Sequence, residues 1–124
     1  MAKIKYSIFS HQPSIYSKEW INLGILFYNV SENTYKFEYT TSWDKVIEFN
    51  AELDLDFLKT KLLAIKNEIE SKNFILYKCN CIEVYIKFYV NVLKFSKITL
   101  EETDDYESFI NEIKGKVLTK VCSL

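Results

Sequence analysis

Apolar and polar residues alternate along the first forty positions in a way that predicts antiparallel strands. Residues 3–11 place isoleucine and tyrosine on one face and lysine and serine on the other, the period of a half-buried strand. Residues 20–28 are apolar on both faces apart from one asparagine, which is typical of a strand covered on each side. Residues 35–40 alternate again after a polar turn, so we expect a hairpin with the second strand central.

The pattern changes to a helical period after residue 42. Ser42 precedes a short apolar segment that ends near Asn50, and its hydroxyl is suited to cap a helix. A longer helix is expected to begin at Asp54 or Asp56 and to end within residues 71–73. Its apolar residues recur at helical spacing along one stripe: Leu58, Leu62, Ile65 and Ile69.

The C-terminal half is less uniform. Residues 74–92 fit both a strand and a helical stripe, although their β-branched content favours a strand. Residues 94–100 suggest a short strand or extended segment. Asp104 and Glu107 have the spacing of an N-cap and its third helical residue, which predicts a last helix. Together the elements predict an α+β fold, an antiparallel sheet of about four strands with helices packed on one face.

The length of 124 residues is that of one domain, so residues 1–124 are expected to form a single globular unit. No apolar run approaches the roughly 20 residues that span a bilayer, and the N-terminus leads into a patterned strand. We therefore expect a cytoplasmic protein without a membrane segment.

Composition excludes several classes of function. Two glycines cannot supply the glycine-rich loops that hold nucleotides, and one histidine rules out two-histidine zinc motifs. All 16 basic residues are lysine and the net charge is −1, which disfavours arginine-based recognition and general nucleic-acid binding. The expectation is a protein that is not an enzyme, uses no cofactor and binds another protein.

Three cysteines are an odd number, which predicts reduced thiols rather than a disulfide framework. Cys79, Cys81 and Cys122 could join His11 as four metal ligands. The Cys-x-Cys spacing lacks the usual spacer of zinc sites, so we expect no metal site.

The start of the second strand breaks local rules and is the first candidate site. Asn22 lies in a strand expected to be buried on both faces, and Gly24 weakens that strand unless close packing requires it. Glu19, Asn22 and His11 could meet where the loop at Pro13 returns, which would place an acid, an amide and an imidazole together. Alternatively, Asn22 bonds the loop backbone, Gly24 permits a bulge and Glu19 pairs with a lysine.

Aromatic residues make up 16% of the chain, more than a core of this size requires. Exposed tyrosine and tryptophan anchor protein interfaces, although a thin core with outward hydroxyl groups would also account for the excess. Trp20, Trp43, Tyr85 and Tyr89 are the aromatic candidates for a binding site. The rings expected to be exposed are Tyr16, Tyr28, Trp43, Tyr77, Tyr85, Tyr89 and Tyr106.

The Tyr6-Ser7-Ile8 strand, Pro13 and the block from Glu19 to Phe27 resemble the opening of a bacterial and phage family, domain of unknown function 3037. Residues 54–58 and 91–118 are also similar to it, so the resemblance touches most of the chain. Some members of that family lie beside genes for Hip-type protein kinases, which implies an accessory or regulatory partner. In that family the segment matching residues 85–95 is often helical.

The sequence therefore predicts a small non-enzymatic protein-binding or regulatory module, with a toxin-like Hip-type kinase as the partner that the resemblance suggests. One alternative is a phage-encoded inhibitor of a bacterial defence complex, similar in role to an anti-CRISPR protein. Another is a magnesium-dependent hydrolase or nuclease that uses Glu19 with Asp44, Asp54 or Asp56, because magnesium requires only oxygen ligands. Helix capping is the simpler explanation for the last two aspartates.

Overall fold

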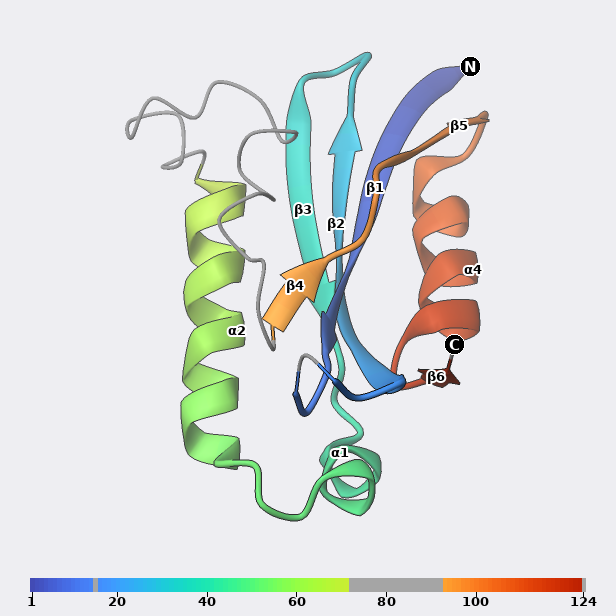
Figure 1. Cartoon of the computed structure of the whole chain (residues 1–124). Coiled ribbons are helices and arrows are strands. Elements are labelled where there is room, and N and C mark those ends of the chain that lie inside the picture. The colour runs from blue at the N-terminus through green and yellow to red at the C-terminus, as the bar shows by residue number, and fades with distance from the viewer. Residues whose placement is uncertain (15, 72–92, 124) are drawn as a thin grey trace.

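The three N-terminal strands form the centre of an antiparallel sheet, which confirms the α+β prediction. The computed structural model describes residues 1–14, 16–71 and 93–123. Within these residues the chain has six strands and three helices, and the main strand order is β3-β2-β1-β4 (Figure 1). The elements are β1 (Ala2–His11), β2 (Glu19–Asn29), β3 (Thr34–Tyr39), α1 (Trp43–Phe49), α2 (Leu55–Glu70), β4 (Leu93–Phe95), β5 (Thr99–Thr103), α4 (Tyr106–Val117) and β6 (Val121–Ser123).

A bulge in β2 divides the β1–β2 ladder into two parts. Phe9 is paired with Gly24, but the next residue of β1, Ser10, is paired with Asn22. Leu23 is therefore an extra residue on β2, the arrangement that defines a β-bulge. The bulge changes which side chains share a face: Leu23 packs in the core on the α2 side, and Asn22 lies on the opposite side.

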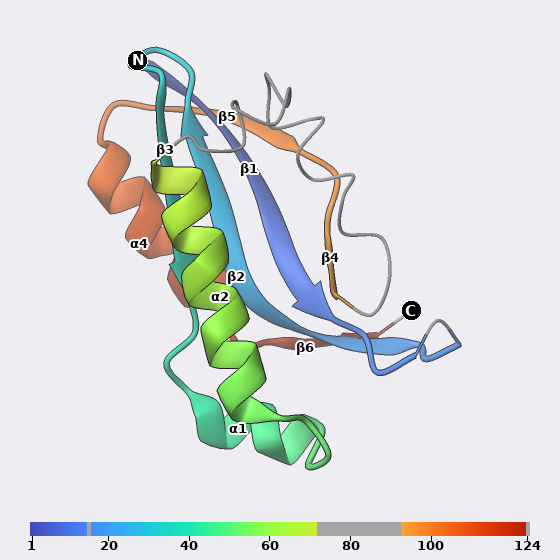
Figure 2. The ribbon, with the colours of Figure 1, turned by 90° about the vertical axis from the view of Figure 1, so that its left-hand side faces the viewer.

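Helices cover both faces of the sheet. The apolar stripe of α2 packs on Phe9, Leu26 and Phe37, whereas α4 buries Ile110 against Ile4, Ile25 and Phe27. Figure 2 shows α2 in front of the sheet and α4 behind it. The prediction that all helices pack on one face therefore fails for α4. The physical reason is β2, whose successive residues are buried on alternate sides and so require a cover on each side.

In the sheet that the described residues form, the outer edge of β3 is closed by two side chains of α2. Glu70 Oε2 accepts a hydrogen bond from the Phe37 amide at 3.0 Å, and Lys66 Nζ donates to the Phe37 carbonyl at 3.0 Å. Lys66 and Glu70 also form an ion pair of 2.7 Å. These side chains occupy the backbone groups that an additional strand would use, which protects the edge strand from pairing with another chain.

Of the three predicted N-caps, that of α2 is confirmed, and those of α1 and α4 differ from the prediction. Asp54 caps α2, since its carboxylate accepts the Phe57 amide at 3.1 Å. The cap of α4 is Asp105 rather than Asp104, because Asp105 Oδ1 accepts the Ser108 amide. Ser42 holds the N-cap position of α1, but its side chain makes no capping hydrogen bond.

The C-terminal half contains more strands than the pattern predicted. The segment 94–100 corresponds to two short strands, β4 and β5, which both pair with β1. β6, which pairs with the start of β2, was not predicted. The ambiguous segment 74–92 lies outside the described residues. Among the residues that the structure describes, no helix is long and apolar enough to cross a membrane.

Tyr106, at the start of α4, carries a buried hydroxyl group that has no hydrogen-bond partner among the described residues. Tyr106 is half-buried, which corrects the expectation that it is an exposed ring. Burial raises the pKa of Tyr106 to about 12, and the nearby charges of Glu107, Glu32 and Glu38 add to the effect. The folded state therefore favours the neutral phenol.

Tyr106→Phe is expected to keep or slightly raise stability at pH 7, because it removes an unsatisfied buried hydroxyl. Because the pKa of Tyr106 is raised in the folded state, its neutral phenol contributes stability below pH ~10, and this contribution is lost as the pH rises toward 12. Urea unfolding at pH 7, 10 and 11.5 should show a steeper alkaline loss for the wild type than for the variant. Tyr16→Phe is the control, since Tyr16 is 86% exposed. Equal alkaline slopes for wild type and Tyr106→Phe would contradict the assignment.

Candidate interaction site

Asn22 joins the start of β2 to the end of α4. Its side-chain amide donates to the Val117 carbonyl at 3.1 Å and contacts Cys122 Sγ at 3.8 Å. Its backbone carbonyl accepts the Thr119 amide, and its own amide donates to the Lys120 carbonyl. The Asn22 side chain is thus satisfied by the C-terminal segment, and not by the loop at Pro13.

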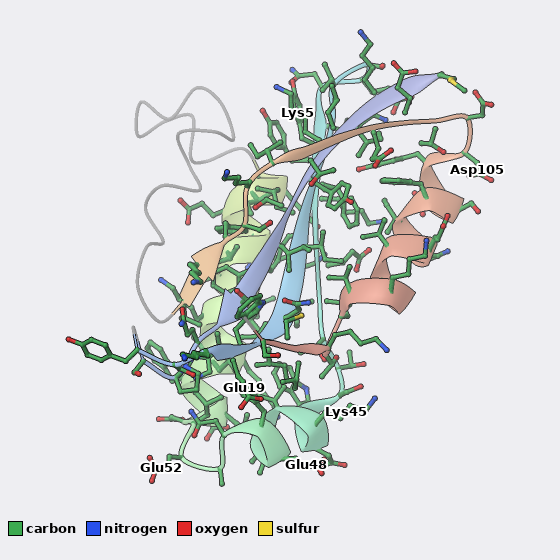
Figure 3. All side chains as sticks on the ribbon, turned by 45° about the vertical axis from the view of Figure 1, so that its right-hand side comes forward. Lys5, Glu19, Lys45, Glu48, Glu52 and Asp105 are labelled. Carbon is green, nitrogen blue, oxygen red and sulfur yellow. The ribbon has the colours of Figure 1, made fainter. Side chains whose placement is uncertain are left out.

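The structure does not bring Asn22 and His11 together. Ser10 is paired with Asn22 and His11 with Ile21, so the two side chains point to opposite faces of the sheet. His11 is buried on the α2 side, where its Nε2 lies 3.2 Å from Asn50 Nδ2. Glu19 is exposed at the start of β2 (Figure 3). The predicted cluster of acid, amide and imidazole is therefore separated by the pleat of the sheet.

Trp20 lies half-buried beside the C-terminal strand. It is paired with Cys122 of β6, and Lys94 Nζ is 6.0 Å from the centre of its ring. Lys94 also donates to Gln12 Oε1 at 2.7 Å. Trp20 is therefore held by neighbours on β4 and β6.

The remaining aromatic candidates are distributed unevenly. Tyr16 is exposed, whereas Tyr28 is half-buried and stacks on Tyr35 with ring centroids 4.4 Å apart. Tyr85 and Tyr89, like Tyr77, lie outside the described residues. Trp43, another of the aromatic binding candidates, lines an open groove.

This groove, which we call the Trp43 groove, lies between the end of β3 and the outer side of α2. Its volume is about 380 Å³, and Leu63 on its α2 wall is 49% exposed. Lys59 Nζ lies 5.1 Å from the centre of the Trp43 ring, a cation–π distance. The described residues that line the groove are Tyr39, Thr41, Trp43, Lys59, Thr60 and Leu63.

A second pocket adjoins the Trp43 groove, and Tyr39 and Thr41 line both. Its volume is about 310 Å³, and three lysines line it, so we call it the lysine pocket. Lys45 comes from α1, Lys114 from α4 and Lys120 from the turn before β6. Figure 3 shows Lys45 on the part of α1 that lies below the C-terminal end of α4. Sequence reasoning missed this pocket because lysines on surface helices are usually only solvated.

The carboxylates of the hydrolase alternative have local roles. Asp54 caps α2, and Asp44 and Asp56 lie in the first turns of α1 and α2, where the helix dipole favours negative charge. Among the described residues, no three His, Cys, Asp or Glu side chains lie close enough together to hold a metal ion.

Comparison with known proteins gave one match. A family model described as "Protein of unknown function (DUF3037)" matches residues 6–113, which is most of the chain. No curated protein and no solved structure matches the chain.

Proposed function

Because the chain belongs to the DUF3037 family, whose description names no activity, we propose its role from its own surface: it is a small non-enzymatic module that binds a protein partner through the Trp43 groove. The observation that carries the proposal is the open groove, in which Trp43, Tyr39 and Leu63 offer apolar surface beside solvent. Tryptophan and tyrosine in such positions supply much of the binding energy of protein interfaces.

The groove favours a partner segment that carries a large apolar side chain next to a carboxylate. The volume of about 380 Å³ accommodates one such side chain, with Trp43 and Leu63 as the apolar walls. Lys59 is the one charged residue among the described residues that line the groove. An acidic residue of the partner would therefore meet an opposite charge at the rim, which promotes specific association.

Leu63→Asp is expected to weaken binding of such a segment at least about tenfold, because it places a carboxylate on the apolar wall. Peptides would be selected from a displayed random library on the wild-type protein, and the affinity of each purified peptide measured by calorimetry. Leu100→Asp is the matched control, since Leu100 is also exposed, at 59%, and lies on β5 outside the groove.

Selected peptides that combine an aromatic or aliphatic residue with acidic neighbours, and that lose affinity for Leu63→Asp but not for Leu100→Asp, support the proposal. Peptides that bind both variants with equal affinity refute the groove as the site. The toxin-like kinase that the resemblance suggests is the first full-length partner for the same comparison.

A further inference from the structure

The lysine pocket brings several positive charges together, although the net charge of the chain is close to zero. The net charge of the chain is −1, yet Lys45, Lys114 and Lys120 from three separate elements line one pocket. None of its described lining residues is acidic. Lys114 pairs with Glu38 at 3.5 Å, whereas neither Lys45 nor Lys120 forms an ion pair with a described residue. Like charges gathered in this way repel one another unless an anion offsets them.

Hydroxyl groups complete the lining of the pocket. Thr41, Ser42 and Thr119 all border it. The side chain of Ser42 makes no capping bond to α1, although Ser42 holds the capping position. Hydroxyl groups can donate to an oxyanion, and ammonium groups supply its counter-charge.

The backbone conformation of Thr119 indicates that its side chain has a role at the pocket. Thr119 follows the C-cap of α4 and has φ = 60°, a position and conformation in which glycine is the usual residue. A β-branched residue in this conformation is strained. What threonine adds over glycine is its side chain, whose hydroxyl lies 2.6 Å from Thr40 Oγ1 at the pocket. Strained residues of this kind gather at binding sites.

The dipole at the C-terminal end of α4 disfavours an anion in the pocket. The C-terminal end of α4 borders the pocket and carries the partial negative charge of a helix end. Two lysines in the last turn of α4, Lys114 and Lys116, place positive charge near that dipole, and they pair with Glu38 and Glu112. Lys45 and Lys120 remain to attract a ligand.

We propose that the lysine pocket binds a phosphate group, supplied either by inorganic phosphate or by a small phosphate ester. A tetrahedral oxyanion with two negative charges matches a site of ammonium and hydroxyl donors, and lysine is a common phosphate ligand. This site adjoins the Trp43 groove, with which it shares Tyr39 and Thr41, but its lysines lie outside the groove, and the inference goes beyond the proposed function.

The test is a titration of the ¹⁵N-labelled protein with sodium phosphate, and in parallel with glycerol 3-phosphate, at constant ionic strength. The amide signals of Thr41, Thr119 and Lys120 should shift and saturate. Lys45→Gln/Lys120→Gln should weaken the affinity at least about tenfold. The control Lys18→Gln/Lys97→Gln removes two exposed lysines outside the pocket and should change the affinity by less than about twofold.

The absence of saturable shifts in the millimolar range, or equal affinities for the two double variants, would overturn the phosphate site. Tighter binding of glycerol 3-phosphate than of phosphate identifies an ester as the source, and the reverse order identifies the free ion. Leu63→Asp should leave phosphate binding unchanged, so failure of the groove and failure of the phosphate site are separate results.

Discussion

Gly24→Ala is expected to lower the free energy of unfolding by about 2 kcal/mol and the melting temperature by roughly 5–10 °C. A Cβ atom at Gly24 would lie 2.6 Å from Phe37 Cζ, closer than real Cβ atoms approach, and 3.1 Å from the Glu38 carbonyl oxygen, which is a tight contact. The Phe37 ring is fully buried and packs edge-on against Phe9, with centroids 6.2 Å apart. Neither the ring nor the backbone can move without disturbing the core, so the added methyl group causes strain.

Urea unfolding of four variants tests this explanation. Phe37→Leu removes the atoms that the methyl group would meet, so the combined Gly24→Ala/Phe37→Leu variant should lose less stability than the two single losses added together. Gly115→Ala is the control, because a Cβ there meets nothing within 4 Å and alanine favours the helix. It should gain up to about 1 kcal/mol. Strict additivity of Gly24→Ala and Phe37→Leu would show that Phe37 is not the cause.

The elements with a strong local period were predictable from the sequence. A helical period of four apolar residues predicted α2, and the structure buries all four: Leu58, Leu62, Ile65 and Ile69. The hairpin of β2 and β3 was predictable for the same reason, since its polar turn and alternating residues are all local signals.

The layers of the sheet could have been inferred more fully. Leu26 and Phe27 are neighbours that point to opposite faces, and both are buried. A strand of this kind requires cover on each face, so the pattern of β2 already argued against helices on one face alone. Which helix covers which face depends on packing between distant segments, and the sequence pattern does not contain it.

The candidate sites were predictable only in part. Trp43 was identified by its residue type, but its groove also needs Leu63, which lies on α2 beside the buried stripe. Lys45 and Lys120 meet only because the end of α4 returns to α1. No local signal carries that return. β6 was missed for the same reason, because three residues form a strand only when β2 is present to pair with them.

Asn22 was singled out from the sequence, and the structure gives its side chain a structural role. The sequence marks it because a buried amide in an apolar strand requires a partner. The structure supplies that partner at the Val117 carbonyl, 3.1 Å away, and thereby ties the end of α4 to β2. The same bond holds the turn that presents Thr119 and Lys120 to the lysine pocket. Asn22 would therefore act on ligand binding through the position of this turn.

Asn22→Asp is expected to lower the free energy of unfolding by about 3 kcal/mol, because a carboxylate of the same size directs negative charge at the Val117 carbonyl. Asn22→Ala should cost less, about 1–2 kcal/mol, since it only removes the hydrogen bond. Urea unfolding gives both values, and hydrogen exchange at the Thr119 and Lys120 amides should show local loosening. Asn111→Ala, on the exposed side of α4, should lose no stability and gain less than about 1 kcal/mol, because alanine favours the helix.

The pH dependence of stability distinguishes this mechanism from a general loss of packing. Once protonated, the carboxyl group of Asn22→Asp can donate to the Val117 carbonyl as the amide does. The folded state then binds this proton more tightly than the unfolded state, so stability relative to the wild type should recover as the pH falls from 7 to 4. Asn22→Ala has no such group and should show a constant deficit. A deficit of Asn22→Asp that does not change with pH would mean that the Val117 carbonyl is not its partner.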